Sequence, residues 1–254
     1  MNKTTKNIII RISFLLSLGV FIFLAVLAKI SRNQNKVNKI LIAVDDQFGN
    51  SFVDKKQVLT IVQDKFTTDH QKVSSNELLK IEKSILVIPQ VNKANAYTDD
   101  NGNLNIKVQQ RIPLFRVYNQ QGNSFYVDLN GVKFPTSNEF TAKVPIVTGA
   151  ILESYDTTNT IKSIELKRIF NIIKTINKNT LWSSMIGQYN ITPQAQVELI
   201  PRLGSSTILL GDDKFIEQKL KRLDIFYFDV LKKVGWDYYK VINIMYKNQI
   251  VCLK

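Results

Sequence analysis

An uncharged run near the N-terminus most limits what this chain can fold into. Residues Ile12–Ala28 are 17 residues without a charge, and the apolar character extends from Ile8 to Ile30. As a helix, 17 residues span about 26 Å, close to the roughly 30 Å hydrocarbon core of a bilayer. The run therefore predicts an uncleaved membrane anchor. A cleaved signal peptide is the alternative, because Val26 and Ala28 are small residues of the kind that precede a cleavage site, although its apolar region spans only about 7–15 residues.

Charge settles neither the orientation of this segment nor the partner class. Basic residues lie on both sides of the run, so the positive-inside rule gives a near tie. They are Lys3, Lys6 and Arg11 before it, and Lys29, Arg32, Lys36 and Lys39 after it. The chain carries a net charge of +13, which favours anionic partners. Its densest basic cluster is Lys219, Lys221, Arg222, Lys232 and Lys233. We interpret this cluster as a solvated helix face rather than a nucleic-acid site.

Residues 39–111 predict a small α+β domain. A short apolar strand covers 40–44, a helix begins at Asp54, and Ser74 with Glu77 forms a capping box for a second helix that ends before Pro89. Two alternating segments then flank Asn101-Gly102, a pair typical of a type I′ hairpin. The order β-α-α-β-β predicts a three-stranded sheet with two helices on one face.

Residues beyond 111 predict a second, β-rich domain with two packed helices. Turns are expected at Gly122-Asn123, Asn130-Gly131 and 204–206, and a short strand at 144–149. One helix is expected over 164–176. A longer one, over 214–234, is expected to be capped by Asp212 or Asp213 and to end at Gly235. The expected apolar stripe of the longer helix is Ile216, Leu220, Leu223, Tyr227, Val230, Leu231 and Val234. Two strands around Lys247-Asn248 close the domain.

The stretch VQQRIPLFRVY, residues 108–118, is unusual for one strand. A proline inside a sheet is tolerated at an edge, a strand start or a bulge. Pro113 is therefore expected at a strand start, with a bend or bulge where the two domains join. Arg111, Pro113 and Arg116 are our candidate interdomain residues. Arg111 either bridges the domains by a charge-assisted bond or lies in solvent.

Nothing in the sequence predicts catalysis, a metal or a cofactor. The acidic pairs at 45–46, 99–100 and 212–213 are explained by turns and helix starts. A lone Cys252 near the C-terminus and a lone His70 in a polar run make neither a triad nor a metal site. An anchored envelope hydrolase would need convergent carboxylates, for which Asp128 and Glu198 are the candidates. What the sequence offers instead is a last strand, QIVCLK, whose edge either binds a partner strand or is covered by a neighbouring segment.

The ordered motifs of the chain resemble the FtsQ/DivIB family of bacterial cell-division proteins. The segments that carry the resemblance are FVDKKQV (52–58), IEKSILVIPQVNKANAY (81–97), VQQRIPLFRVY (108–118), YVDLNGVKFP (126–135), VPIVTG (144–149) and INIMYKNQIVCLK (242–254). Each motif is weak alone, and their order and spacing are specific. The family's pattern is matched in particular at Ile81, Glu82, Pro89, Val91, Ala94, Gln110, Arg111, Pro113 and Arg116.

The resemblance implies the domain organisation. It assigns residues 1–11 to a cytoplasmic tail, 12–30 to a transmembrane helix and 31–38 to a linker. Residues 39–111 would form a POTRA-like domain and 112–254 an FtsQ-type β domain. The bulk of the chain is then periplasmic, on a cytoplasmic (inner) membrane at the division site.

The resemblance also implies a non-enzymatic scaffold. It would bind FtsB- and FtsL-like division proteins by strand addition and help regulate septal peptidoglycan synthesis, with the POTRA-like domain as a second docking site. The partner-binding residues carried over are Tyr246, Asn248, Gln249, Ile250 and Val251. Where the family often has a basic residue before that tyrosine, this chain has Met245, so a contact that needs this charge is not carried over. Another POTRA-bearing envelope assembly protein is the main alternative.

Overall fold

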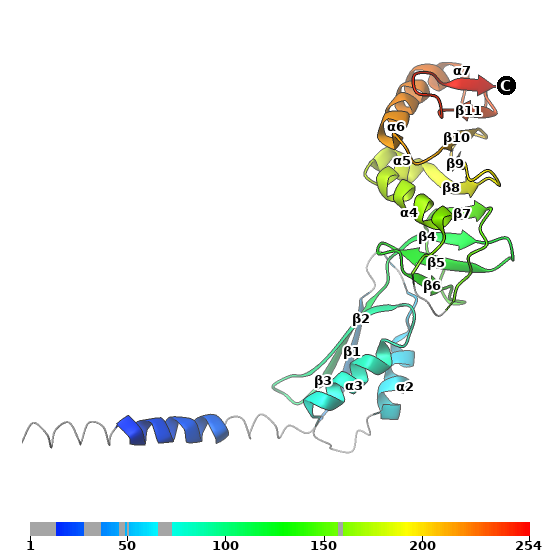
Figure 1. Cartoon of the computed structure of the whole chain (residues 1–254). Coiled ribbons are helices and arrows are strands. Elements are labelled where there is room, and N and C mark those ends of the chain that lie inside the picture. The colour runs from blue at the N-terminus through cyan, green and yellow to red at the C-terminus, as the bar shows by residue number, and fades with distance from the viewer. Residues whose placement is uncertain (1–13, 28–36, 46–48, 50, 66–72, 157–159) are drawn as a thin grey trace, which may run out of the picture. The chain divides into compact units, whose positions relative to one another are not determined.

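The computed structural model describes residues 14–27, 37–45, 49, 51–65, 73–156 and 160–254 (Figure 1). Two compact units divide the chain. The first contains residues up to 46 and 53–110, and the second contains 47–52 and 111–254. Residues 14–27 are helical. No helix within the described residues combines the length and apolarity needed to cross a membrane, and the ends of the expected 12–30 segment lie outside them.

The first unit is a three-stranded sheet with two helices. Its elements are β1 (Ile40–Asp45), α2 (Lys55–Lys65), α3 (Ser75–Ile85), β2 (Val91–Thr98) and β3 (Leu104–Gln110). The strand order is β1-β3-β2, with β1 parallel and β2 antiparallel to β3. Alternate residues of β3 are buried because α2 and α3 pack on the sheet. The order of elements and the capping box at Ser74 are confirmed.

Gln110 explains the polar residues at the end of β3. Its side-chain oxygen accepts a hydrogen bond from the backbone N–H of Val53 at 2.8 Å. Its side-chain nitrogen donates to the carbonyl of Asp45, also at 2.8 Å. The glutamine is buried. Its side chain gives a hydrogen-bond partner to two backbone groups, one at the end of β1 and one near the start of α2, that would otherwise lack this partner.

The second unit is built on a nine-stranded sheet (Figure 1). Its strands are β4 (Pro113–Tyr118), β5 (Ser124–Asp128), β6 (Lys133–Pro135), β7 (Ile146–Gly149), β8 (Ile186–Ile191), β9 (Val197–Pro201), β10 (Thr207–Gly211), β11 (Val241–Asn243) and β12 (Val251–Leu253). Their order is β12-β11-β10-β9-β8-β7-β4-β5-β6. Strand pairs β4–β7, β7–β8 and β10–β11 are parallel, and the other neighbours are antiparallel.

Helices on this sheet close the main core. They are α4 (Ile164–Ile176), α5 (Thr180–Met185), α6 (Ile216–Ile225), the π-helix η2 (Phe226–Leu231) and α7 (Lys232–Val234). The helix over 164–176 is confirmed, whereas α5 was not predicted. The buried side chain of Trp182 in α5 donates to the carboxylate of Asp224 in α6 at 2.6 Å, which ties these two helices together.

The start of the long helix differs from the prediction. Phe215 occupies the N-cap position with φ 55° and makes no capping bond, and α6 begins at Ile216. Asp212 instead accepts a hydrogen bond from the Lys219 ammonium group at 2.8 Å. The stripe is also only partly right, because the wider turns of η2 shift the register. Leu231 is buried as predicted, but Val234 is exposed and Val230 is only half-buried.

Three hairpin turns share one design, which the sequence analysis missed. Asp99, Asn119 and Asp128 each accept two backbone N–H bonds, from the residues two and four positions later. A glycine with φ between 75° and 79° follows three positions after each of them. Non-glycine residues of the 99–103 turn have negative φ, so the predicted type I′ turn is wrong. The β8–β9 turn keeps part of the pattern: the side chain of Thr192 accepts the backbone N–H of Gln196, four positions later, and Ala195 has φ 58°.

Candidate functional site

Strand β12 ends the large sheet on one side. It pairs antiparallel with β11, and β11 pairs parallel with β10. In the part of the chain that the structure describes, no strand pairs with the outer side of β12. Its side chains are also open, since Val251 is 39% exposed and Leu253 is 60% exposed. An open edge with apolar side chains is the geometry that accepts an added strand.

Most of the predicted contact residues lie beside this strand rather than in it. Tyr246, Asn248 and Gln249 are exposed in the loop of residues 244–250, which joins β11 to β12. Ile250 is half-buried against the main core, and Val251 is the first residue of β12. The strand itself adds Cys252 and Leu253, which the sequence placed in the last strand, QIVCLK, but which were not predicted as contact residues. The position of Leu253 in the closing strand segment QIVCLK was the signal available in the sequence.

Arg222 of α6 fastens this loop and was missed as a site residue. Its guanidinium donates to the carbonyl of Tyr246 at 2.9 Å and to that of Ile244 at 3.4 Å. The backbone N–H of Met245 donates to the side chain of Asn243 at 2.9 Å. The Tyr246 backbone is thereby held in place, while its side chain stays in solvent. The sequence placed Arg222 only within a basic helix face.

The three candidate interdomain residues all lie in the second unit. Arg111 forms an ion pair with Asp128 at 2.9 Å, at the turn after β5. Pro113 is the first residue of β4, and the register shifts between Pro113 and Phe115, so the predicted strand start and bulge are confirmed. The Arg116 guanidinium lies 4.7 Å from the ring centre of Tyr118. A role of these residues between domains stays a prediction.

Two carboxylates considered for hydrolysis do not converge. Asp128 ends β5, and Glu198 lies in β9, where it accepts a hydrogen bond from Asn190 at 2.8 Å. The strands β4, β7 and β8 separate them in the sheet. Four strand spacings amount to about 19 Å. Glycosidases hold their two carboxyl groups roughly 5–9.5 Å apart, so this pair does not fit that chemistry.

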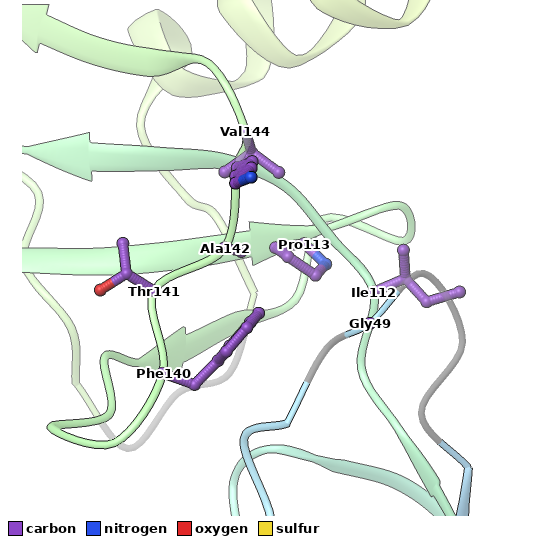
Figure 2. A pocket seen from close by; sticks show the side chains of 8 residues that line it. Gly49, Ile112, Pro113, Phe140, Thr141, Ala142 and Val144 are labelled. Atoms are coloured by element: carbon purple, nitrogen blue, oxygen red, sulfur yellow. The ribbon is translucent and has the colours of Figure 1, made fainter.

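A cavity of about 600 Å³ opens beside the start of β4 (Figure 2). Ile112 and Pro113 line one side and the segment from Phe140 to Val144 lines the other, as Figure 2 shows. The described lining is mainly apolar, with Lys143 as its ionisable member. Such a lining suits an apolar group better than acid–base chemistry, which uses paired ionisable groups. No cluster of metal-binding side chains occurs among the described residues.

A family model described as "FtsQ/DivIB, C-terminal related" matches residues 112–253. The chain belongs to the FtsQ/DivIB family. The match covers β4 to β12, that is, the large sheet and the candidate edge. No curated protein matches the chain.

Membership of the FtsQ/DivIB family gives the chain a role in bacterial cell division at the division site. Proteins of this family are generally non-enzymatic scaffolds that interact with other division proteins. The open edge of β12, rather than a catalytic cleft, is therefore our candidate functional site.

Proposed function

We propose that this FtsQ/DivIB-family chain is a membrane-anchored divisome scaffold that recruits FtsB- and FtsL-like partners by strand addition at β12 and so helps regulate septal peptidoglycan synthesis. The observation that carries the proposal is the unpaired outer side of β12 among the described residues. Backbone groups of an added strand would supply affinity, and alternating side chains would supply specificity. Tyr246, Asn248, Gln249, Ile250 and Val251 flank or begin this edge.

The small size of the edge limits the affinity that it provides alone. β12 contains three residues, Val251–Leu253. An interface on one short strand buries on the order of 1,200 Å² or less, a range typical of weak or transient complexes. Additional contacts on the loop of residues 244–250, or a second docking site on the POTRA-like unit, would strengthen it.

The anchor belongs to the same proposal. The uncharged run Ile12–Ala28 supports it, with the N-terminal tail in the cytoplasm and the two units outside the inner membrane. Under this arrangement, alkaline carbonate leaves the full chain in the membrane pellet, and protease added to spheroplasts digests the units. Release by carbonate, or protection from the protease, would contradict the arrangement.

Binding of the full chain to the extracytoplasmic segment of the host's FtsB-like protein tests the scaffold. We expect truncation after Met245 to abolish binding, and the double substitution Val251→Asp/Leu253→Asp to weaken it, because charges on an edge strand oppose pairing. The matched control is Leu41→Asp, which places a charge on the edge strand β1 of the other sheet. Circular dichroism checks that each variant is folded.

The outcomes separate this proposal from its alternatives. Binding that is lost in the β12 variants and kept in Leu41→Asp supports strand addition at β12. Equal binding by all variants moves the contact elsewhere on the chain. No binding by the unaltered chain would remove the FtsB-like protein as the partner, and with it the proposed recruitment at β12.

A further inference from the structure

Strand β2 is the longest edge strand in the part of the chain that the structure describes. It contains eight residues, whereas β1 contains six and β6 and β12 contain three each. One side of β2 pairs with β3, and none of the described strands pairs with the other side. The unpaired backbone groups of an edge strand are a template to which another chain can add a strand. By length alone, a partner strand would be expected to add to β2 rather than to β12.

A side chain of α3 occupies one backbone donor on the outer side of β2. The carboxylate of Glu82 accepts a hydrogen bond from the backbone N–H of Ala96 at 2.8 Å. In an antiparallel pair, residues whose N–H bonds to the neighbouring strand alternate with residues whose N–H points away from it. Ala96 pairs with Ile106 of β3, and its N–H points away because Glu82 is its acceptor. An added strand would need this same N–H for one of its own carbonyl groups.

The small side chains of β2 allow Glu82 to reach this donor. Ala94 and Ala96 are buried, whereas Lys93 and Asn95 are exposed, so the alanines lie on the face of the strand that α3 covers. A methyl group on this face leaves space at the edge that a larger side chain would fill. Glu82 follows the buried Ile81 of α3, which places its carboxylate at the border of the helix face that packs on the sheet.

Two further features of β2 oppose the addition of a strand. Lys93 is exposed, and the register of the β2–β3 pair shifts between Val91 and Lys93, which marks a bulge. Lysines on the edge, bulges and inward-pointing charged side chains are means by which proteins prevent pairing at sheet edges. None of these features occurs in the described β12, because its register with β11 is continuous and Val251 and Leu253 are exposed apolar side chains.

We propose that Glu82 is a specificity-determining residue, because its carboxylate closes the edge of β2 to strand addition and so keeps partner strands off the longest edge of the chain. An added strand would replace a hydrogen bond to a charged acceptor by a weaker one to a neutral carbonyl. Addition at β12 requires no such exchange among the described residues. The closure of β2 is independent of the proposed function, whereas its effect on the choice of edge rests on that function.

Disulfide cross-linking between two copies of the chain tests the closure of β2. The full chain in detergent micelles carries Asn95→Cys, at an exposed position near the middle of β2, and Cys252→Ser, which removes the native cysteine. Antiparallel pairing of two β2 strands brings their central residues within disulfide distance. We expect Glu82→Ala in this background to raise the yield of cross-linked dimer at least about fivefold, since it frees the edge for pairing.

Two further variants complete this test. Lys83→Ala is the matched control, because Lys83 is an exposed charged residue of the same helix, and it should leave the yield unchanged. Glu82→Gln keeps an acceptor for the Ala96 N–H without the charge, so its yield should lie between those of the two alanine variants. Circular dichroism checks that each variant is folded. The proposal is overturned if Glu82→Ala, or Glu82→Gln where the alanine variant does not fold, gives the same yield as Lys83→Ala.

Binding of the extracytoplasmic segment of the host's FtsB-like protein tests the effect on the choice of edge. In the full chain with Val251→Asp/Leu253→Asp, whose β12 edge is blocked, adding Glu82→Ala should lower the Kd at least about threefold, because a second edge becomes available. Increased cross-linking without this gain in affinity would keep the closure of β2 and exclude its role in the choice of edge. Absence of binding by the unaltered chain would instead remove the proposed function and leave cross-linking as the test of Glu82.

Discussion

Lys133 is a buried cation that the sequence did not single out. Its side chain is 1% exposed, yet its ammonium group lies 2.9 Å from Glu153 and 2.7 Å from Asp156. It also donates to the carbonyl of Ser154 at 3.1 Å. Glu153 in turn accepts the backbone N–H of Ser163, the N-cap of α4. One side chain of β6 thereby ties the sheet edge to the start of a helix.

Replacing Lys133 by Met should lower the free energy of unfolding by about 3 kcal/mol, because Glu153 would remain buried without its cation. Urea denaturation measures this change. Lys162→Met is the control, since Lys162 is exposed and lies 3.7 Å from Asp156, and it should cost less than about 0.5 kcal/mol. Equal losses of unfolding free energy in the two variants would show that the buried ion pairs of Lys133 contribute no more to stability than the exposed ion pair of Lys162.

The pH dependence of the stability should follow from the contact between Lys133 and Glu153. Burial opposes the charged forms of Lys133 and Glu153, but their hydrogen bonds outweigh it, so the pKa of Lys133 is raised and that of Glu153 is lowered. The lowered carboxyl pKa gives stability above the unfolded value of about 4.3, and this is lost as pH falls through the folded value. The difference between the native chain and Lys133→Met should therefore be constant at neutral pH and shrink in acid.

The hairpin turns show that a few residues determine the conformation of a short loop. Asp99, Asn119 and Asp128 each stand three positions before a glycine, and each loop closes by the same bonds. The β8–β9 loop places Ala195 where the others have glycine, at φ 58°. A residue with a Cβ in this region costs about 1–2 kcal/mol relative to its preferred conformation.

Ala195→Gly should therefore stabilise the protein by up to about 1 kcal/mol, after the greater flexibility of glycine in the unfolded chain is subtracted. The converse change, Gly122→Ala, should destabilise it by about the same amount, because φ is 79° there and no atom obstructs the added methyl group. Thermal unfolding of both variants measures the two shifts. Shifts of the same sign would contradict this account of the turns.

Elements with strong local signals were predictable, and elements set by packing were not. Ser74 with Glu77 placed the start of α3, and the spacing of Leu166, Ile169 and Ile173 placed α4. The short helix α5 was not predicted, because its position depends on the hydrogen bond from Trp182 to Asp224, a residue 42 positions later in the chain. The π-helix η2 was not predicted either, because the spacing of apolar residues does not distinguish a single i to i+5 turn from an α-helical one.

At the scale of the whole molecule, the second unit includes a segment from before α2. Phe52, which the sequence assigned to the first domain, belongs to it, and its ring centre lies 5.3 Å from that of Tyr126 and 4.9 Å from that of Phe140. Phe52 is buried. The family match begins at residue 112 and so leaves this contributor out. Contacts over about 75 residues of chain cannot be read from periodicity, which reports local structure.

Phe52→Ala should cost the second unit about 3–5 kcal/mol, because the aromatic cluster loses a buried ring and gains a cavity. Tryptophan fluorescence follows this unit, since Trp182 and Trp236 both lie in it. Phe215→Ala serves as the matched control, because that ring is exposed, and it should change stability by less than about 0.5 kcal/mol. A similar cost for both changes would place Phe52 outside the core.

The parallel strand pairs set an order of events for the chain as it folds. Hairpins such as β4–β5 join neighbouring segments and close in about 1–10 μs. The pairs β7–β8 and β10–β11 instead join strands that are separated in the chain by α4 and α5, or by α6, η2 and α7. These pairs must wait for the helices between them, since non-local pairing forms late. Among the described residues, β12 pairs with β11, and β11 joins the rest of the sheet through the parallel pair β10–β11. We therefore expect the edge of β12, our proposed binding site, to join the sheet after the local hairpins have formed, so a half-folded chain would not compete for a partner.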